Sequence, residues 1–99
     1  MANLNFKIIT IICEPVLSTS LISMIRTLGA TGFTLTDVRG EGSGENRSGE
    51  VPSEKVKIEV IAEAELANKI MNEIAKNYFE NYSLIVYASN IEIIRQAKF

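Results

Sequence analysis

The stretch GATGFTLTDVRGEGSGENRSGEVPSEKVKIEVIA, residues 29–62, decides the fold of this chain. Within it, residues 31–39 are rich in Thr, Phe and Val, which favour strands. Residues 55–62 alternate: Val56, Ile58, Val60 and Ala62 face one way, and Lys57, Glu59 and Ile61 face the other. Two such segments in succession predict a β-hairpin. Its connection, residues 40–54, is far longer than the roughly two to five residues that a hairpin needs, and such long connections are usually functional or disordered.

The flanking sequence supplies two more strands and two helices. We predict a strand over residues 6–13 (FKIITIIC) and, after Glu14-Pro15, a helix over residues 16–28 that Gly29 caps in a left-handed conformation. A second helix is predicted over residues 63–79 and a last strand over residues 84–88. Residues 90–95 form a short final element that could be either helix or strand. The order β-α-β-β-α-β predicts one α+β domain over residues 1–99, a ferredoxin-like βαββαβ sandwich with four antiparallel strands and both helices on one face.

The sheet face away from the helices is also expected to be apolar. We assign Ile9, Ile11 and Ile61 to that face, because the first strand carries apolar side chains in every phase. A single chain would leave this face in water. Because exposed patches of that size usually mark an interface, the sequence predicts a homo-oligomer.

The composition restricts the kinds of function. The chain has 99 residues, of which 46% are hydrophobic and 22% charged, as is typical of one globular domain. Without His and with one Cys, it cannot form a Ser-His-Asp or Cys-His catalytic site, an imidazole metal site or an intramolecular disulfide. A net charge of −2 disfavours nucleic acid, and no apolar run is long enough to span a membrane. We therefore predict a cytoplasmic protein that is not an enzyme and holds no metal and no prosthetic group.

The long connection has the composition of an anion-binding loop. Four of the six glycines lie in it, and its start, Arg39-Gly40-Glu41-Gly42-Ser43-Gly44, can turn backbone N–H groups toward a ligand. Arg39 and Arg47 are two of only four arginines, and the Arg side chain suits bidentate phosphate contacts. No Gly-Lys-Ser/Thr follows and no helix begins there, so neither a Walker A loop nor a dinucleotide fingerprint is present. A solvated hairpin loop with mixed charges is the alternative from spacing alone.

The run of residues 29–52 followed by KVKIEVIA (residues 55–62) resembles the PII-like signal transduction superfamily. The SbtB-type carbon-regulatory branch is the most similar, because Gly40-Glu41-Gly42-Ser43 with Arg47-Ser48, and Tyr78-Phe79-Glu80-Asn81-Tyr82, match its recurrent segments. The resemblance implies a homotrimer whose sheets pack inward and whose clefts between subunits bind adenyl nucleotides (AMP, ADP, ATP or cyclic AMP). It also implies that the long loop, the T-loop, regulates a partner, a membrane bicarbonate transporter, which would bring the cytoplasmic protein to the inner face of the membrane.

The resemblance further implies roles for individual residues. Gly40, Gly42 and Ser43 would cradle phosphate, with Arg47 as its main cation and Arg39 beside them. Thr34, Glu59 and Ile61 would line the adenine side from one subunit, Tyr82 could stack on the base, and Arg95 would add a charge. Residues 81–84 would take the place of the second nucleotide loop.

The sequence departs from the family pattern at that second loop. Nitrogen-regulating PII proteins have a Gly-rich loop with a Lys after the second helix, whereas this chain has Glu80-Asn81-Tyr82-Ser83. The T-loop also has no Tyr. The alternative hypothesis is therefore a trimeric protein-interaction module with the same fold that binds no nucleotide. Cys13, at the end of a buried strand, is expected to be a core residue and not a nucleophile.

Overall fold

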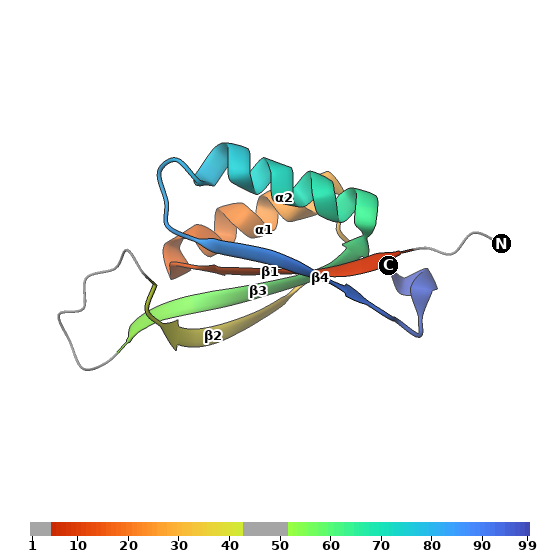
Figure 1. The fold of residues 1–99 in the computed structure, drawn as a ribbon, viewed down its shortest axis with the longest axis horizontal. Helices are drawn as coiled ribbons and strands as arrows, with labels where there is room; N and C mark the ends of the chain where they lie inside the picture. The colour runs from red at the N-terminus through yellow and green to blue at the C-terminus, as the bar shows by residue number, and fades with distance from the viewer. Residues whose placement is uncertain (1–4, 43–51) are drawn as a thin grey trace.

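The predicted hairpin is present in a computed structural model, which describes residues 5–42 and 52–99. Strands β2 (Thr34–Gly40) and β3 (Ser53–Glu63) pair antiparallel, from Gly40 opposite Ser53 at the loop end to Thr34 opposite Glu59. Strand β1 (Phe6–Cys13) pairs with β3 on one side and with β4 (Ile85–Ile91) on the other, also antiparallel. The strand order is therefore β2-β3-β1-β4 (Figure 1).

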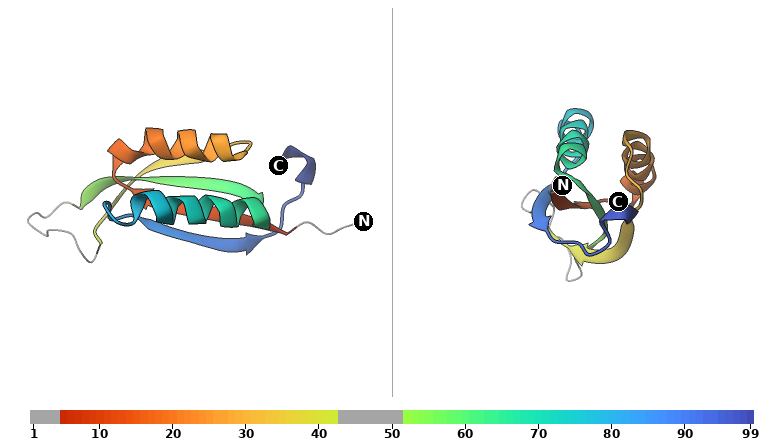
Figure 2. Two further views of the ribbon diagram at one scale, coloured as in Figure 1. Left: turned by 90° about the horizontal axis from the view of Figure 1, so that it is seen from above. Right: turned by 90° about the vertical axis from the view of Figure 1, so that its right-hand side faces the viewer.

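Both helices cover the same face of this sheet, and the other face is left bare (Figure 2). Helix α1 (Ser18–Leu28) follows the short 3-10 turn η1 (Pro15–Leu17) and ends at Gly29, whose φ of 118° is the left-handed cap that the sequence predicts. Helix α2 (Ala64–Tyr78) buries Ala67, Ile70 and Ile74 along one stripe. The ferredoxin-like α+β sandwich is thus confirmed.

The hydrophobic core lies between the helices and the sheet, and one prediction about it is wrong. Ile9 and Ile11 were expected on the bare face, but both are fully buried beneath the helices. The strand FKIITIIC is apolar in both phases, so alternation along it cannot tell one face from the other. The strand register shows which side chains of β1 face the core. Ile9 lies opposite Val60 and Ile11 lies opposite Ile58, and both partners on β3 face the core.

The bare face carries the other phase of each strand. Ile8, Thr10 and Ile12 of β1 lie opposite Ile61, Glu59 and Lys57 of β3 and opposite Ser89, Tyr87 and Ile85 of β4. The assignment of Ile61 to this face is confirmed. Ile85 and Tyr87 are about half exposed. An isolated chain therefore presents an apolar surface here, as the sequence predicts.

The ends of several elements differ from the prediction. The second strand starts at Thr34 instead of residue 31, because residues 30–33 carry the chain from the helix layer down to the sheet. The last strand runs on to Ile91, since β1 offers partners as far as Phe6. Of the unassigned final element, residues 90 and 91 belong to β4, and a 3-10 turn η2 (Gln96–Lys98) follows. The first helical turn is η1, and α2 is one residue shorter at each end.

Cys13 is a core residue, as expected. It is fully buried at the end of β1, and burial is the main reason why the pKa of its thiol rises from 9.0 to about 11. The neighbouring Glu14 carboxylate raises this pKa further, whereas the Lys55 ammonium lowers it. The thiol is therefore protonated at neutral pH, which makes it a poor nucleophile.

Candidate functional site

A cavity of about 520 Å³ lies at the base of the loop between β2 and β3. Its walls come from three parts of the chain: the end of β2 with the first loop residues, the start of β3, and the connection from α2 into β4. These parts meet because the β2–β3 hairpin and the short α2–β4 connection both lie at the same end of the sheet (Figure 1). The lining residues are Ile12, Val38, Arg39, Gly40, Glu41, Gly42, Lys55, Lys57, Ser83, Leu84, Ile85 and Tyr87. We refer to this space as the loop-base cavity.

Three cationic side chains line the loop-base cavity. Lys55 and Lys57 are two residues apart on β3, so both belong to the sheet face away from the helices, and Arg39 lies on the neighbouring strand. Lys55 is only 6% exposed, and its Nζ lies 3.7 Å from the Glu14 Oε1. Burying an ammonium group is costly without an anionic partner, so Glu14 helps to hold Lys55 in place. The cluster offers cations to an anionic ligand, beside the Glu41 carboxylate in the lining and Glu54, which lies opposite Arg39.

The lining next to these cations is apolar. Leu84 and Ile85 lie where the connection enters β4, and Ile12 of β1 lies between Ile85 and Lys57 in the sheet. Tyr87 is half exposed and lines the same cavity. A cavity with cations beside an aromatic ring and aliphatic groups fits a ligand that has an anionic end and a flat apolar end.

The loop-base cavity brings together three of the predicted site residues. Arg39, Gly40 and Gly42 all line it. A Cβ atom built on Gly40 would meet no atom of residues 5–42 or 52–99 within 4 Å, so none of these residues demands glycine there. Ser43 and Arg47 lie outside the described residues. Of the connection 81–84, Ser83 and Leu84 line the cavity.

The other predicted site residues lie elsewhere in the single chain. Thr34 and Glu59 face each other across β2 and β3, about 20 Å along the strand from Gly40, and Ile61 lies further along. Tyr82 packs on Tyr78, with ring centroids 5.9 Å apart, and the Tyr78 hydroxyl is 2.7 Å from the Ser20 Oγ. Arg95 precedes η2 at the opposite end of the sheet. Thr34, Glu59, Ile61 and Arg95 thus lie away from the loop-base cavity of their own chain, whereas Tyr82 directly precedes Ser83, which lines that cavity.

Sequence reasoning did not select Lys55, Lys57 and Tyr87. The alternation along residues 55–62 assigns Lys57 only to the side of the strand that faces away from Val56, Ile58 and Val60. A signal was nevertheless present: in an antiparallel hairpin, residues equally far from the loop lie side by side, and the register places Arg39 opposite Glu54, one residue before Lys55. The lysines therefore lie at the same end of the hairpin as Arg39 and line the same cavity.

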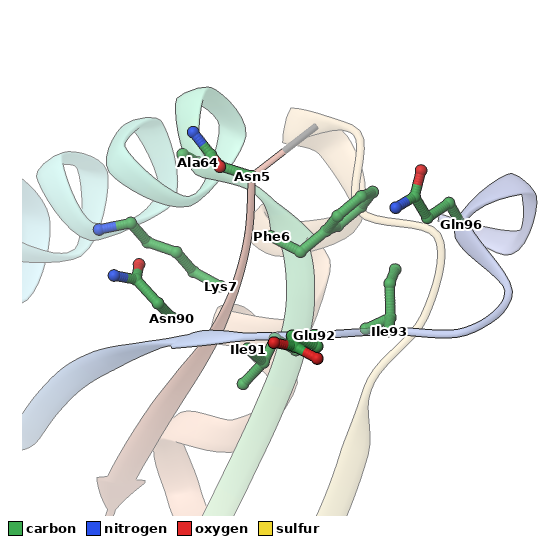
Figure 3. A pocket seen from close by; sticks show the side chains of 9 residues that line it. All are labelled: Asn5, Phe6, Lys7, Ala64, Asn90, Ile91, Glu92, Ile93 and Gln96. Atoms are coloured by element: carbon green, nitrogen blue, oxygen red, sulfur yellow. The ribbon is translucent and has the colours of Figure 1, made fainter. Parts of the chain in front are cut away.

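A second cavity, of about 540 Å³, lies at the other end of the sheet (Figure 3). The side chains of Lys7 and Asn90 lie together near Ala64 at the start of α2, while Phe6 and Gln96 lie on the other side. Among its described lining residues there is one cation, Lys7, and one carboxylate, Glu92. This balance gives it no preference for anions, and the loop-base cavity is the better candidate.

Residues 5–42 and 52–99 offer neither a cluster of metal ligands nor a membrane-spanning helix. Within those ranges no three His, Cys, Asp or Glu side chains come close enough to share a metal ion. The helices described there are also too short or too polar to cross a membrane.

Comparisons with known proteins agree with this fold. The model of a family described as nitrogen regulatory protein P-II matches residues 6–98. A protein from Thermus thermophilus, described as PII-like and signalling, is 33% identical with a TM-score of 0.81, over 100% of this chain and 99% of that chain. CPII from Thiomonas intermedia, bound to ADP, AMP and acetate, is 21% identical with a TM-score of 0.80, over 100% of this chain and 98% of that chain. CPII bound to ADP and bicarbonate is 22% identical with a TM-score of 0.80, over 96% and 94% of the two chains.

Proposed function

The chain belongs to the nitrogen regulatory protein P-II family, and on that premise we propose that it is a signal transducer that binds adenyl nucleotides at the loop-base cavity. The observation that carries the proposal is that Arg39, Lys55 and Lys57 line one cavity together with apolar side chains and an aromatic ring. A nucleotide has the matching anionic and flat ends. CPII, which shares this fold, has been solved with ADP and AMP, and in a further structure with ADP and bicarbonate. The protein acts as a sensor, without a catalytic step.

The sensor is proposed to be a homotrimer with nucleotide in the clefts between subunits. The bare sheet face supports this, because Ile8, Ile61, Ile85 and Tyr87 would otherwise remain in water. The separation of the predicted residues supports it as well. Arg95 lies too far from the loop-base cavity of its own chain and would reach the cavity of a neighbour.

Placing a charge on the bare face should dissociate the trimer. Ile8 lies opposite Ile61 on one side and Ser89 on the other, so Ile8→Glu would bury a carboxylate against apolar side chains of the neighbouring copies. We expect sedimentation equilibrium to give three times the 10.9 kDa mass of one chain for the wild type. The variant should give the mass of one chain. Glu92→Asp at the far end serves as the control and should stay trimeric. A monomeric wild type would contradict the trimer.

The residue roles follow from this arrangement. Gly40, Gly42 and Ser43 are proposed to cradle the phosphate, together with Arg39 and Arg47. Thr34, Glu59 and Ile61 line the adenine side of a cleft from the other subunit. Tyr82 is held by Tyr78 beside the connection that enters the cavity, where its ring could extend the apolar wall. Arg95 adds a cation from the neighbouring chain.

We also propose which branch of the family the chain belongs to, and which partner it regulates. The loop and the Tyr78–Tyr82 segment favour the SbtB-type carbon-regulatory branch. On that basis the partner is a bicarbonate transporter, and the protein is cytoplasmic and held at the inner face of the membrane by that partner. The mechanism is loop ordering: a bound nucleotide orders the glycine-rich T-loop in advance and so changes the entropy cost of docking.

A thermal-shift screen tests nucleotide binding. A ligand that binds only the folded protein raises its melting temperature, so we expect AMP, ADP, ATP or cyclic AMP at millimolar concentration to raise it by several degrees. Guanosine monophosphate and inorganic phosphate serve as controls for the base and for the anion alone.

One observation favours a second function, a protein-interaction module without nucleotide. The connection Glu80-Asn81-Tyr82-Ser83 offers neither Gly nor Lys to a phosphate. An unchanged melting temperature with all four nucleotides would favour that module over the sensor.

A further inference from the structure

Tyr78, the last residue of α2, makes contacts through its backbone, its ring and its hydroxyl. Its carbonyl oxygen accepts hydrogen bonds from the N–H groups of Asn81 (3.3 Å) and Tyr82 (2.9 Å), so the chain turns directly after the helix. Its ring packs on the Tyr82 ring, with the centroids 5.9 Å apart and the planes inclined by 46°. Its hydroxyl lies 2.7 Å from the Ser20 Oγ on α1. Tyr78 therefore joins the end of one helix to the start of the other.

The Ser20 side of this link is itself held in place. The Ser20 hydroxyl donates to the Leu17 carbonyl oxygen at 3.2 Å, which leaves its own oxygen to accept the proton of the Tyr78 hydroxyl. Leu17 is buried in the core, and Ser20 lies in the first turn of α1. The start of α1 and the end of α2 both lie at the end of the sheet where β4 begins (Figure 1). The Tyr78 hydroxyl is thus fastened to the helix layer beside the α2–β4 connection.

The chain after Tyr78 leads directly into the loop-base cavity. Ser83 and Leu84 follow Tyr82 and line the cavity, and β4 begins at Ile85, which lines it too. Leu84 and Ile85 belong to its apolar lining, whereas its cations come from β2 and β3. A contact that holds the turn after α2 therefore also places part of the apolar lining.

From these contacts we propose that Tyr78 is a positioning residue for nucleotide binding: it fixes the α2–β4 connection, so that Leu84 and Ile85 are in place before the flat end of the nucleotide arrives. The inference rests on the proposed nucleotide binding. A connection that is ordered in advance costs the ligand less to bind, because its entropy has already been lost on folding. Without the side-chain contacts of Tyr78, the nucleotide would have to order the connection itself and would bind more weakly.

The test is calorimetry of the full chain with AMP, at a temperature where every variant is folded. Tyr78→Phe keeps the ring and loses the hydrogen bond to Ser20. That bond lies at the molecular surface and its net contribution is modest, so we expect AMP affinity to fall by about two- to fivefold. Tyr78→Leu also loses the ring contact with Tyr82, and we expect a fall of about tenfold or more.

Variants of Ser20 test whether the hydrogen bond is the cause. Ser20→Ala should weaken AMP binding as much as Tyr78→Phe does, whereas Ser20→Thr keeps a hydroxyl and should bind like the wild type. The double variant with Ser20→Ala and Tyr78→Phe should bind no more weakly than either single variant, because both changes remove the same bond. Losses that add in the double variant would mean that the two hydroxyls act separately, and would contradict the inference.

A core variant separates positioning from stability. Ile70 is fully buried on α2, about two turns before Tyr78, so Ile70→Val should lower the melting temperature and leave AMP affinity unchanged. If AMP affinity in Tyr78→Leu stays within about twofold of the wild type, or falls as far in Ile70→Val, the inference alone is overturned. A wild type that binds no nucleotide would overturn the proposed function and the inference together.

Discussion

Replacing Arg39 by Gln is expected to weaken AMP binding by about ten- to a hundredfold. Arg39 is the cation of the loop-base cavity that lies nearest in sequence to Gly40 and Gly42, at the end of β2. Its guanidinium can donate two parallel hydrogen bonds to a phosphate. A hydrogen bond to a charged group contributes about 1.5–3 kcal/mol, and every 1.4 kcal/mol corresponds to a factor of about ten in affinity. Isothermal titration of the purified variant measures the change.

A second arginine provides the control for Arg39. Arg26 lies on α1 with its guanidinium carbon 5.2 Å from the centre of the Phe33 ring, and it does not line the loop-base cavity. Arg26→Gln removes the same charge and should leave AMP affinity within about twofold of the wild type. If Arg39→Gln binds AMP as tightly as Arg26→Gln does, Arg39 makes no phosphate contact and the site must be sought elsewhere.

The sheet topology could be predicted because the hairpin carried two independent signals. Residues 55–62 alternate cleanly, and Val56, Ile58 and Val60 are buried as expected. The glycine-rich connection also separates two strand-forming segments. Strand β1 lacked the first signal, since it is apolar in every phase, and its two faces could be told apart only through its partners on β3 and β4. Pairing between distant strands is a property of the fold that local periodicity does not contain.

The candidate site was only partly predictable for a similar reason. The glycines and Arg39 stand out in the sequence because they are uncommon and clustered. Lys55 and Lys57 do not stand out, because alternating lysines on a strand usually face solvent. Their importance comes from position: pairing of β2 with β3 places them at the same end of the hairpin as Arg39, and the end of the α2–β4 connection lines the same cavity. Residues such as Thr34 and Arg95 lie away from this cavity in the single chain, so their predicted roles depend on the proposed trimer.

The second large effect is a loss of stability when a core side chain is shortened. Ile58→Ala should lower the free energy of unfolding by about 2–5 kcal/mol, because it removes buried carbon atoms and leaves a cavity that the neighbours cannot fill. Ile58 is fully buried and lies opposite Ile11 on β1 and Leu35 on β2, so it joins three of the four strands beneath the helices. For a domain of about 100 residues such a loss lowers the melting temperature by roughly 10 °C or more. Urea unfolding at one fixed protein concentration measures it, since subunit association would otherwise change the apparent stability.

Two further substitutions show whether burial is the cause. Ile58→Val removes only one carbon and should lower the unfolding free energy by about 0.5–1.5 kcal/mol. Val16 in η1 is 83% exposed, so Val16→Ala should change it by no more than about 0.5 kcal/mol. The loss of unfolding free energy should therefore be largest for Ile58→Ala, smaller for Ile58→Val and smallest for Val16→Ala, because each change in this order removes less buried apolar surface. Equal losses at the two positions would mean that Ile58 does not lie in the core between sheet and helices, and the register that places it opposite Ile11 would be wrong.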